Sequence, residues 1–394
     1  MAVAMRDLLA GLAARWRKRG WDLALGVGIA RGYATIGAIG FEGRLDYGAI
    51  GTVTNLAARL CGEAAGGQIL ISARGPAHSE GAGPTGTDLE RPWVTIGLTP
   101  MNISICQIHP VFVGEVSGTD LTRPLSREEV AAIEAGMDRY AVLVFRDQKI
   151  TDEQQMVFSR NFGGLEDARG GNISKPEDKR LQVGMNDVSN LGRDGQPLQR
   201  DSRVRLFNLG NMLWHSDSSF RAIPAKYSLL SARVVNPTGG NTEFADMRAA
   251  YDALDADTRA QIEDFVCEHS LMYSRGSLGM LDYSEEERAM FRPVHQRLVR
   301  THPVTGRKSL YLSSHAGGIV GWPMPEARGY LRDLIEHATQ REFVYTHKWR
   351  IGDLVMWDNR QTMHRARPFP AHEPRDMRRT TLVGDGPTAA QATA

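Results

Sequence analysis

Residues 213–217 read Leu-Trp-His-Ser-Asp, and this stretch determines how the rest of the chain is interpreted. On a β-strand, residues two apart project from the same face, so His215 and Asp217 can both reach one metal ion. An imidazole nitrogen and a carboxylate oxygen supply two ligands of a facial triad. A second histidine from elsewhere would complete the triad and leave open positions for substrate and oxygen, as non-haem Fe(II) oxygenases require.

The His-x-Asp pattern is weak when taken alone, because a chain with 11 histidines contains one or two His-x-acid matches by chance. His78-Ser79-Glu80 is such a match, but it lies in a Gly/Pro-rich stretch where no strand would hold the two side chains. The third ligand must come from a distant strand. His364, which follows a predicted strand and a short connection, is a candidate, and a capped or solvated surface histidine is the alternative.

Arginines near the C-terminus can anchor an anion. Arg375 follows His364 by eleven positions. A dicarboxylate co-substrate needs an anchor at the end remote from the metal, and the planar guanidinium binds a carboxylate through two parallel hydrogen bonds. If 375–381 is a strand, Arg375 and Arg379 share one face and Arg378 points away. For any one of these arginines, a solvated salt bridge is the alternative role.

Composition excludes several classes of partner. The 394 residues carry 47 Lys+Arg and 46 Asp+Glu, for a net charge of +1, which argues against a nucleic-acid partner. No apolar run approaches the length of a membrane span and no signal peptide is recognisable, so we expect no membrane partner. The three cysteines (Cys61, Cys106 and Cys267) form no CxxC pair, which disfavours a disulfide scaffold and a structural zinc site and favours a cytoplasmic location.

The amino-acid composition and the predicted secondary structure change along the chain. Residues 1–72 are typical of a small α/β piece, with strand-like segments at 23–29 and 69–71. Residues 73–100 are rich in Gly and Pro and are predicted to be a linker. A long region with interspersed strands and helices occupies 101–385, and we expect a disordered tail at 386–394.

Within the long region, Ser126-Arg127-Glu128-Glu129 is a capping-box start for a helix that includes Ile133 and Met137. Further helices are expected at about 152–162, 256–269 and 325–337. Strands are expected at 141–145, 227–235, 309–312, 343–349 and 353–357. Many short strands with a few outer helices predict a mainly β fold, an antiparallel barrel or jelly roll rather than a doubly wound sheet.

At these residues the chain resembles the Fe(II)- and 2-oxoglutarate-dependent dioxygenases of the taurine / 2,4-dichlorophenoxyacetate dioxygenase family. The resemblance extends over about 103–384 and implies a double-stranded β-helix (jelly roll) core. The stretches that carry it are VSGTDLTRPL, YAVLVFRDQ, WHSDSSF, PTGGNTEFADMRAAYDAL, SSHAGGIVGWP, GDLVMWDNRQTMHRARPF and RDMRRTT.

The resemblance implies roles for the motif positions, which occur in the family's order. His215, Asp217 and His364 match the Fe(II) ligands. Thr242 and Arg375 match the positions that hold the distal carboxylate of 2-oxoglutarate. From the residues alone, Thr242 would be an ordinary β-branched residue in a strand that follows a Gly-Gly turn.

The resemblance also implies a substrate. Arg379 matches a position that meets the anionic head of the primary substrate, and Asn211 one that lines the substrate pocket. WHSDSSFRAIPAKYSLL and GGNTEFADMRAAYDAL look most like the aryloxyalkanoate branch. The implied substrate is a small anionic aromatic molecule such as 2,4-dichlorophenoxyacetate.

The implied reaction hydroxylates the carbon next to the ether oxygen, consumes O2 and releases a phenol and glyoxylate together with succinate and CO2. Ascorbate is the expected reductant in vitro. The alternative is a taurine-like alkylsulfonate as substrate of the same fold, because Arg379 can hold either a carboxylate or a sulfonate. We also expect a homo-oligomer.

The N-terminal piece resembles the C-terminal half of a class III nucleotide cyclase domain, in LGVGIARGYATIGAIG, RLDYGAIGTVTNLAARL and GGQILIS. Asn55 and Arg59 match the family's Asn-x-x-x-Arg pair. The part that brings the metal-binding aspartates is absent, and Thr52 stands where an Asp is usual, so we expect an inactive fragment. The alternative is a fusion in which 1–72 binds a nucleotide and regulates the oxygenase.

Overall fold

The computed structural model describes residues 103–167 and 179–390, together with short pieces of the first 71 residues. The chain divides into two compact units, Met1–Met101 and Asn102–Ala394. Among the described residues, no helix is both long and apolar enough to cross a membrane.

The described part of the first unit contains four strands and a few helical residues. The predicted strands near 23–29 and 69–71 form a parallel pair, and an antiparallel hairpin lies between them in the sequence. These strands are β1 (Val27–Ile29), β2 (Thr35–Phe41), β3 (Arg44–Ile50) and β4 (Ile69–Ile71). Thr52, Asn55, Arg59 and the linker 73–100 lie outside the described residues, so the cyclase-like fragment stays a prediction.

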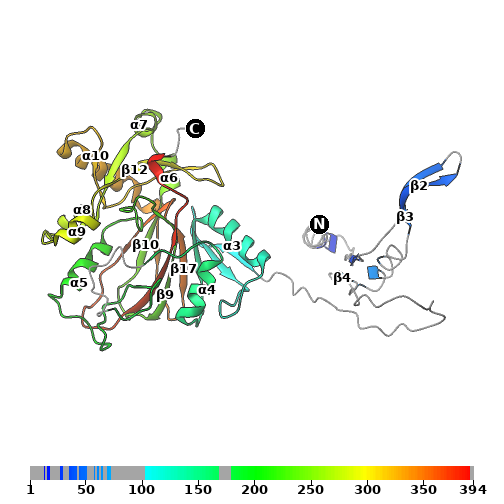
Figure 1. The fold of residues 1–394 in the computed structure, drawn as a ribbon, viewed down its shortest axis with the longest axis horizontal. Coiled ribbons are helices and arrows are strands. Elements are labelled where there is room, and N and C mark those ends of the chain that lie inside the picture. The colour runs from blue at the N-terminus through cyan, green and yellow to red at the C-terminus, as the bar shows by residue number, and fades with distance from the viewer. Residues whose placement is uncertain are drawn as a thin grey trace. The chain divides into compact units, whose positions relative to one another are not determined.

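A large sheet forms the centre of the second unit (Figure 1). Its seven strands, in spatial order, are β5 (Ser104–Gln107), β6 (Gly114–Ser117), β7 (Val142–Phe145), β17 (Leu354–Asp358), β9 (Ala225–Val234), β19 (Asp376–Val383) and β8 (Asn186–Asp187). All neighbouring pairs are antiparallel except β6 and β7. The predicted strands at 141–145, 227–235 and 353–357 are confirmed as its central strands. β7 and β17 are buried throughout, as their apolar sequences predict.

A smaller antiparallel sheet packs against one face of the large one. Its strands, in spatial order, are β16 (Val344–His347), β10 (Thr242–Asp246) and β18 (Thr362–Ala366). Phe244 on β10 and Trp357 on β17 share one buried cluster, with ring centroids 5.4 Å apart. The mainly β prediction is therefore confirmed, and β18 carries His364 at the junction of the two sheets.

Helices cover the opposite face of the large sheet. They are α3 (Arg127–Tyr140) and α4 (Asp152–Arg160), drawn beside β17 and β9 in Figure 1. Each begins with a capping box, formed in α3 by Ser126 and Glu129 as the sequence predicts. Ile133 and Met137 pack into a cluster with Leu229 and Met356 from the sheet.

A further layer is formed by the segment that lies between β10 and β16 in the sequence. It comprises α6 (Met247–Asp252), α7 (Ala256–Ile262), β11 (Val266–His269), α8 (Leu271–Gly276), α9 (Glu285–Met290), β12 (Val294–Arg297), β13 (Val299–Thr301), β14 (Lys308–Leu310), β15 (Ala316–Ile319) and α10 (Met324–Ala338). β11 is the centre of a sheet with β12 and β15. Trp214 and Met363, which flank the site described below, join the core of this layer.

Two predictions need correction. The helix expected at 256–269 ends at Ile262, and its second half is the strand β11, because Cys267 and His269 are buried between two antiparallel neighbours. The tail expected to be disordered from 386 begins with a short turn at Thr388–Ala390. The Thr388 hydroxyl is buried there, where it donates to Gln296 Oε1 at 2.5 Å. Residues 391–394 lie outside the described part.

We predict that Ser126→Ala lowers the free energy of unfolding by about 1 kcal/mol, because it removes the side-chain acceptor of the Glu129 amide at the start of α3. Ser284→Ala removes the same capping box from α9, a helix with no buried residue. That helix can fray without exposing a core, so the loss should be smaller. Urea unfolding of both variants checks this, and equal losses would contradict it.

Candidate metal centre and active site

Two histidines that are distant in the sequence face each other across one backbone bridge. The His215 amide donates to the His364 carbonyl at 2.9 Å, and the His364 amide donates to the His215 carbonyl at 2.8 Å. Their ring centroids are 4.2 Å apart. Residues directly opposite in an antiparallel pair point to the same face. The bridge therefore brings both imidazoles to one side of the backbone.

The prediction that His215 and Asp217 lie on a strand is wrong. Only His215 makes a β-bridge, and Asp217 begins a turn. A polar loop holds this turn in place: the Asp217 amide donates to Asn359 Oδ1 at 3.1 Å, and the Ser216 hydroxyl donates to the Asn359 carbonyl at 3.1 Å. The turn still directs the carboxylate to the side on which His215 projects.

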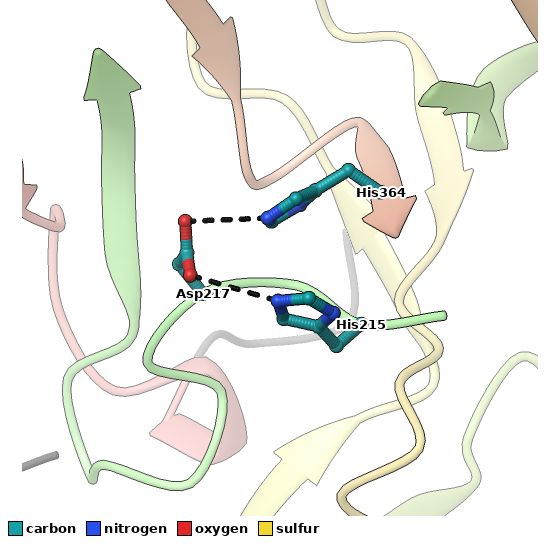
Figure 2. Close-up of side chains that lie close together, drawn as sticks. All are labelled: His215, Asp217 and His364. Atoms are coloured by element: carbon teal, nitrogen blue, oxygen red, sulfur yellow. Dashed lines mark ion pairs between the residues drawn. The ribbon is translucent and has the colours of Figure 1, made fainter. Parts of the chain in front are cut away.

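His215, Asp217 and His364 form a compact buried group (Figure 2). His215 Nε2 lies 3.9 Å from Asp217 Oδ1, and His364 Nε2 lies 3.7 Å from Asp217 Oδ2. One ligand atom from each residue lies within 4.8 Å of the other two. Within 103–167, 179–390 and the described pieces before them, this is the only such set of three metal-ligating side chains.

The hydrogen bonds of the group fit a metal ion. His215 Nδ1 lies 2.8 Å from the Leu213 carbonyl. Because a carbonyl can only accept, this nitrogen carries the proton, and the lone pair is left on Nε2, which faces Asp217. His364 also directs Nε2 at the carboxylate. Two imidazole nitrogens and one carboxylate are a ligand set suited to Fe(II) and similar divalent metals.

Donors hold the Asp217 carboxylate from behind. The Ser228 hydroxyl donates to Oδ2 at 2.8 Å and accepts from Asn359 Nδ2 at 2.9 Å. Arg379 donates to Oδ1 and forms an ion pair with it. A carboxylate has about four acceptor positions, so the oxygens keep lone pairs for a metal. Arg379 thus contacts a predicted metal ligand.

The protonation states suit metal binding. Burial lowers the pKa of His215 to about 4 and holds the pKa of His364 well below its usual value. Burial alone would raise the pKa of Asp217, but the charge of Arg379 and the nearby histidines outweigh it and lower the pKa to about 2. At neutral pH both imidazoles are therefore neutral and the carboxylate is ionised, as metal ligands must be.

Arg375 is a buried cation that lies over the Phe369 ring, 5.3 Å from the ring centroid, and whose side chain donates only to backbone carbonyls. It donates to the Gly240 carbonyl at 3.2 Å and to the Val188 carbonyl at 3.3 Å. In the part of the chain that the structure describes, no carboxylate forms an ion pair with it, and burial lowers its pKa to about 10. Thr242 lies two residues after Gly240 on β10, and its hydroxyl accepts from Trp349 Nε1 at 3.0 Å.

Asn211 lies between two small cavities. One, of about 90 Å³, has Asn211 and Arg375 on its wall. The other, of about 60 Å³, is lined by Asn211, His215, Asp217 and Arg379. A larger cavity, of about 580 Å³, is lined by residues between 167 and 208 and by none of the three predicted metal ligands. The structure therefore brings Asn211 and Arg379 to a cavity that His215 and Asp217 also line. Arg375 lines the other cavity, which shares Asn211 with the first and is lined by none of the three predicted metal ligands, and Thr242 lies on β10 outside both.

Sequence reasoning missed several side chains of this site. Ser228 and Asn359 orient Asp217, and the only signal for Ser228 was a polar residue within an apolar strand. His315 lies with its ring 6.0 Å from the His215 ring, and its Nδ1 is 2.9 Å from the Ser274 hydroxyl. No local pattern marks a residue that comes to a site from a separate layer.

Comparisons with known proteins identify the family of the chain. Residues 104–381 match the model of the family described as taurine catabolism dioxygenase TauD, TfdA family. The chain belongs to this family. It is 47% identical over 287 residues to an alpha-ketoglutarate-dependent 2,4-dichlorophenoxyacetate dioxygenase of Cupriavidus pinatubonensis, covering 72% of this chain and 99% of that protein. It is 37% identical over 268 residues to an (S)-phenoxypropionate/alpha-ketoglutarate-dioxygenase of Delftia acidovorans, covering 64% and 86%.

Solved structures give the same result. A crystal structure of AAD-2 in complex with Mn(II) and N-oxalylglycine matches with 69% identity and a TM-score of 0.72, covering 73% of this chain and 100% of that one. A putative alpha-ketoglutarate-dependent 2,4-D dioxygenase from Burkholderia xenovorans matches with 42% identity and a TM-score of 0.61, covering 72% and 98%.

We predict that His215→Ala and Asp217→Ala each weaken Mn(II) binding by more than the roughly 10- to 100-fold expected from loss of an outer-shell partner. The reason is that each removes a ligand atom from the metal. Isothermal titration with Mn(II) measures the effect. His295→Ala, at an exposed histidine, is the matched control and should bind as the unaltered chain does. Unchanged binding by the His215→Ala or Asp217→Ala protein would contradict the assignment.

Proposed function

We propose that this chain is an Fe(II)- and 2-oxoglutarate-dependent dioxygenase that oxidises an aryloxyalkanoate such as 2,4-dichlorophenoxyacetate. The observation that carries the proposal is the buried group of His215, Asp217 and His364, with Arg379 on the wall of the same cavity as His215 and Asp217. Arg375 lines a second cavity, which shares Asn211 with the first. The substrate class is supported by two relatives named for aryloxyalkanoates, one of them matched over almost its whole length.

The fold proposal is that the seven-stranded and three-stranded sheets are the two halves of a double-stranded β-helix. It is supported by their shared buried core around Phe244 and Trp357. In this arrangement the metal ligands lie where β18 meets the loop before β9. We also propose that the chain forms a homo-oligomer, which sedimentation analysis can test.

The residues that would hold Fe(II) are His215, Asp217 and His364. Bound there, the metal supplies open coordination positions at which 2-oxoglutarate and O2 can react. The proposal of a metal with a 2-oxoglutarate-like ligand is supported by the structure of AAD-2, which was solved in complex with Mn(II) and N-oxalylglycine. Each turnover places one oxygen atom of O2 in succinate and the other in the substrate, with loss of CO2.

The chain's own residues bind and orient the two anions. Arg375 is buried without a carboxylate partner among the described residues, so it can bind the distal carboxylate of 2-oxoglutarate through charge-assisted hydrogen bonds. Thr242, near the Gly240 carbonyl to which Arg375 donates, assists that carboxylate. Arg379 holds Asp217 in place and contributes positive charge to the cavity that receives the substrate. Ser228 keeps the Asp217 carboxylate in one orientation.

Hydroxylation of the carbon next to the ether oxygen yields a hemiacetal. Its collapse breaks the bond between that carbon and the ether oxygen. An acetic-acid side chain then leaves as glyoxylate, and the aryl group leaves as a phenol. The protein contributes by positioning one C–H bond toward the metal site. Holding the two reactants in this geometry makes a bimolecular step effectively unimolecular.

An alkylsulfonate is the second candidate substrate. A sulfonate carries one negative charge on a compact head, as a carboxylate does, so a guanidinium recognises both. A relative named alpha-ketoglutarate-dependent sulfate ester dioxygenase, from Pseudomonas putida, is 29% identical over 291 residues. The higher identity to the two aryloxyalkanoate relatives favours the aryl substrate.

The test is aerobic incubation of the full chain with Fe(II), ascorbate, 2-oxoglutarate and 2,4-dichlorophenoxyacetate, with 2,4-dichlorophenol and succinate both measured. We expect the two products in equal amounts, because one turnover forms one of each. Taurine in place of the aryl acid is the matched comparison. If succinate forms with taurine and not with the aryl acid, the substrate is an alkylsulfonate rather than an aryloxyalkanoate. If folded, metal-loaded protein forms neither product, the proposed function is refuted.

We further predict that Arg375→Gln raises the KM for 2-oxoglutarate about 10- to 100-fold, the loss expected for a hydrogen bond to a charged group. The metal ligands are untouched, so Mn(II) binding should stay unchanged. Steady-state kinetics and Mn(II) titration check the two effects. Arg378→Gln is the matched control, because Arg378 is directed at Asp152 and Asp376. An unchanged KM in the Arg375→Gln protein would remove Arg375 from the co-substrate site.

A further inference from the structure

Arg275 is a second buried cation beside the metal ligands. It lies on α8, in the layer formed by the segment between β10 and β16 in the sequence, and only 5% of its surface is exposed. It lines the same cavity as His215, Asp217 and Arg379. No feature of the local sequence marks it, because it reaches the site from a separate layer.

The charge of Arg275 is not compensated by the described part of the protein. Its Nη1 donates to the Ser274 hydroxyl at 3.1 Å, and its Nε has no hydrogen-bond partner there. Across 103–167 and 179–390, no Asp or Glu forms an ion pair with it. The buried Arg248 and Arg360, in contrast, pair with Asp246 and Asp358 at 2.8 Å. A buried charge without a counter-ion costs free energy. An unpaired guanidinium at a cavity wall therefore indicates that an anion bound in the cavity pairs with it.

The surroundings of Arg275 hold the guanidinium in place. It lies over the Phe207 ring at 4.7 Å from the ring centroid. It also lies against Gly210, where an added Cβ would be 2.3 Å from Arg275 Cζ. Gly210 directly precedes Asn211, which lines the same cavity. The absence of a side chain at 210 thus leaves the space that the guanidinium occupies.

Arg379, the other cation of this cavity, is already engaged. It forms an ion pair with Asp217, so part of its charge and hydrogen-bonding capacity serves the metal ligand. Glu166 on the cavity wall accepts from the Ser218 hydroxyl at 2.7 Å and lies 3.7 Å from Arg221. Arg275 therefore carries the uncompensated positive charge on the described wall. Phe220 and Leu271 line the same cavity and offer apolar contact to an aromatic ring.

We propose that Arg275 binds the carboxylate of the aryloxyalkanoate substrate, together with Arg379. This inference rests on the proposed function and adds to it the residue that recognises the acid group. Arg275 acts in binding, so its loss raises the KM for the acid far more than it lowers kcat, and it has no part in holding the metal or 2-oxoglutarate.

The test is calorimetric titration of the full chain, loaded with Mn(II) and 2-oxoglutarate without O2, with 2,4-dichlorophenoxyacetate and with its uncharged amide. We expect Arg275→Gln to weaken binding of the acid about 10- to 100-fold. Binding of the amide, of Mn(II) and of 2-oxoglutarate should not change. A merely structural role would not separate the acid from the amide.

The matched control is Arg300→Gln. Arg300 is also buried, also lies over an aromatic ring (Tyr311, at 4.7 Å), and lies outside the cavity that Arg275 lines. Its loss should leave the preference for acid over amide unchanged. Arg275→Lys keeps the charge without the planar fork and should lose less affinity than Arg275→Gln. Gly210→Ala displaces the guanidinium without removing it and should also weaken acid binding.

The outcomes separate the two proposals. If the unaltered chain binds and converts the acid, and folded Arg275→Gln protein binds it equally well, the role of Arg275 is overturned and the function stands. If Arg275→Gln does not fold, wild-type affinity for the acid in both the Arg275→Lys and Gly210→Ala proteins overturns that role. If the unaltered chain neither binds nor converts the acid, the proposed function and the role of Arg275 fail together.

Discussion

The pair of backbone hydrogen bonds between His215 and His364 is the contact on which the site depends. It ties the loop before β9 to β18, so two imidazoles that are far apart in the sequence lie 4.2 Å apart between ring centroids. β18 is itself held by pairing with β10, and the small sheet by packing of Phe244 on Trp357. A shift of either sheet would separate the predicted metal ligands. The geometry of the candidate metal centre is thus a property of the packed core.

The charges of the site follow a simple pattern. The one carboxylate of the triad is held by Ser228 and Arg379. Arg375 and Arg275 are buried without carboxylate partners among the described residues. Burying an unpaired cation costs free energy. If two organic anions bind these arginines, as we propose, their binding also stabilises the folded state, as linkage requires for any ligand of that state.

Local patterns predicted the fold well where a segment's own residues supply the hydrogen-bond partners or the apolar surface that its structure needs. The apolar runs of β7 and β17 had to be buried strands, and the capping box at Ser126 had to start a helix, because neighbouring residues supply the needed partners. The interpretation failed at 256–269, where helical periodicity was outweighed by strand pairing of β11 on both sides. It failed also at 213–217, where a turn held by Asn359 replaced the expected strand.

By itself, the sequence determined the types of candidate ligand, a histidine and a carboxylate two positions apart, and a balance of charge that argues against a nucleic-acid surface. From the residues alone it made His364 a candidate for the third ligand, with a capped or solvated surface histidine as the alternative, and the family resemblance then matched His364 to an Fe(II) ligand. The tertiary structure decided which side chains meet: His364 through its bridge to His215, Ser228 and Asn359 behind Asp217, and Arg275 from an inserted layer. The physical reason is that these contacts join residues that are far apart in the sequence, so no helix or strand periodicity relates them. Only the packing of sheets and layers brings them together.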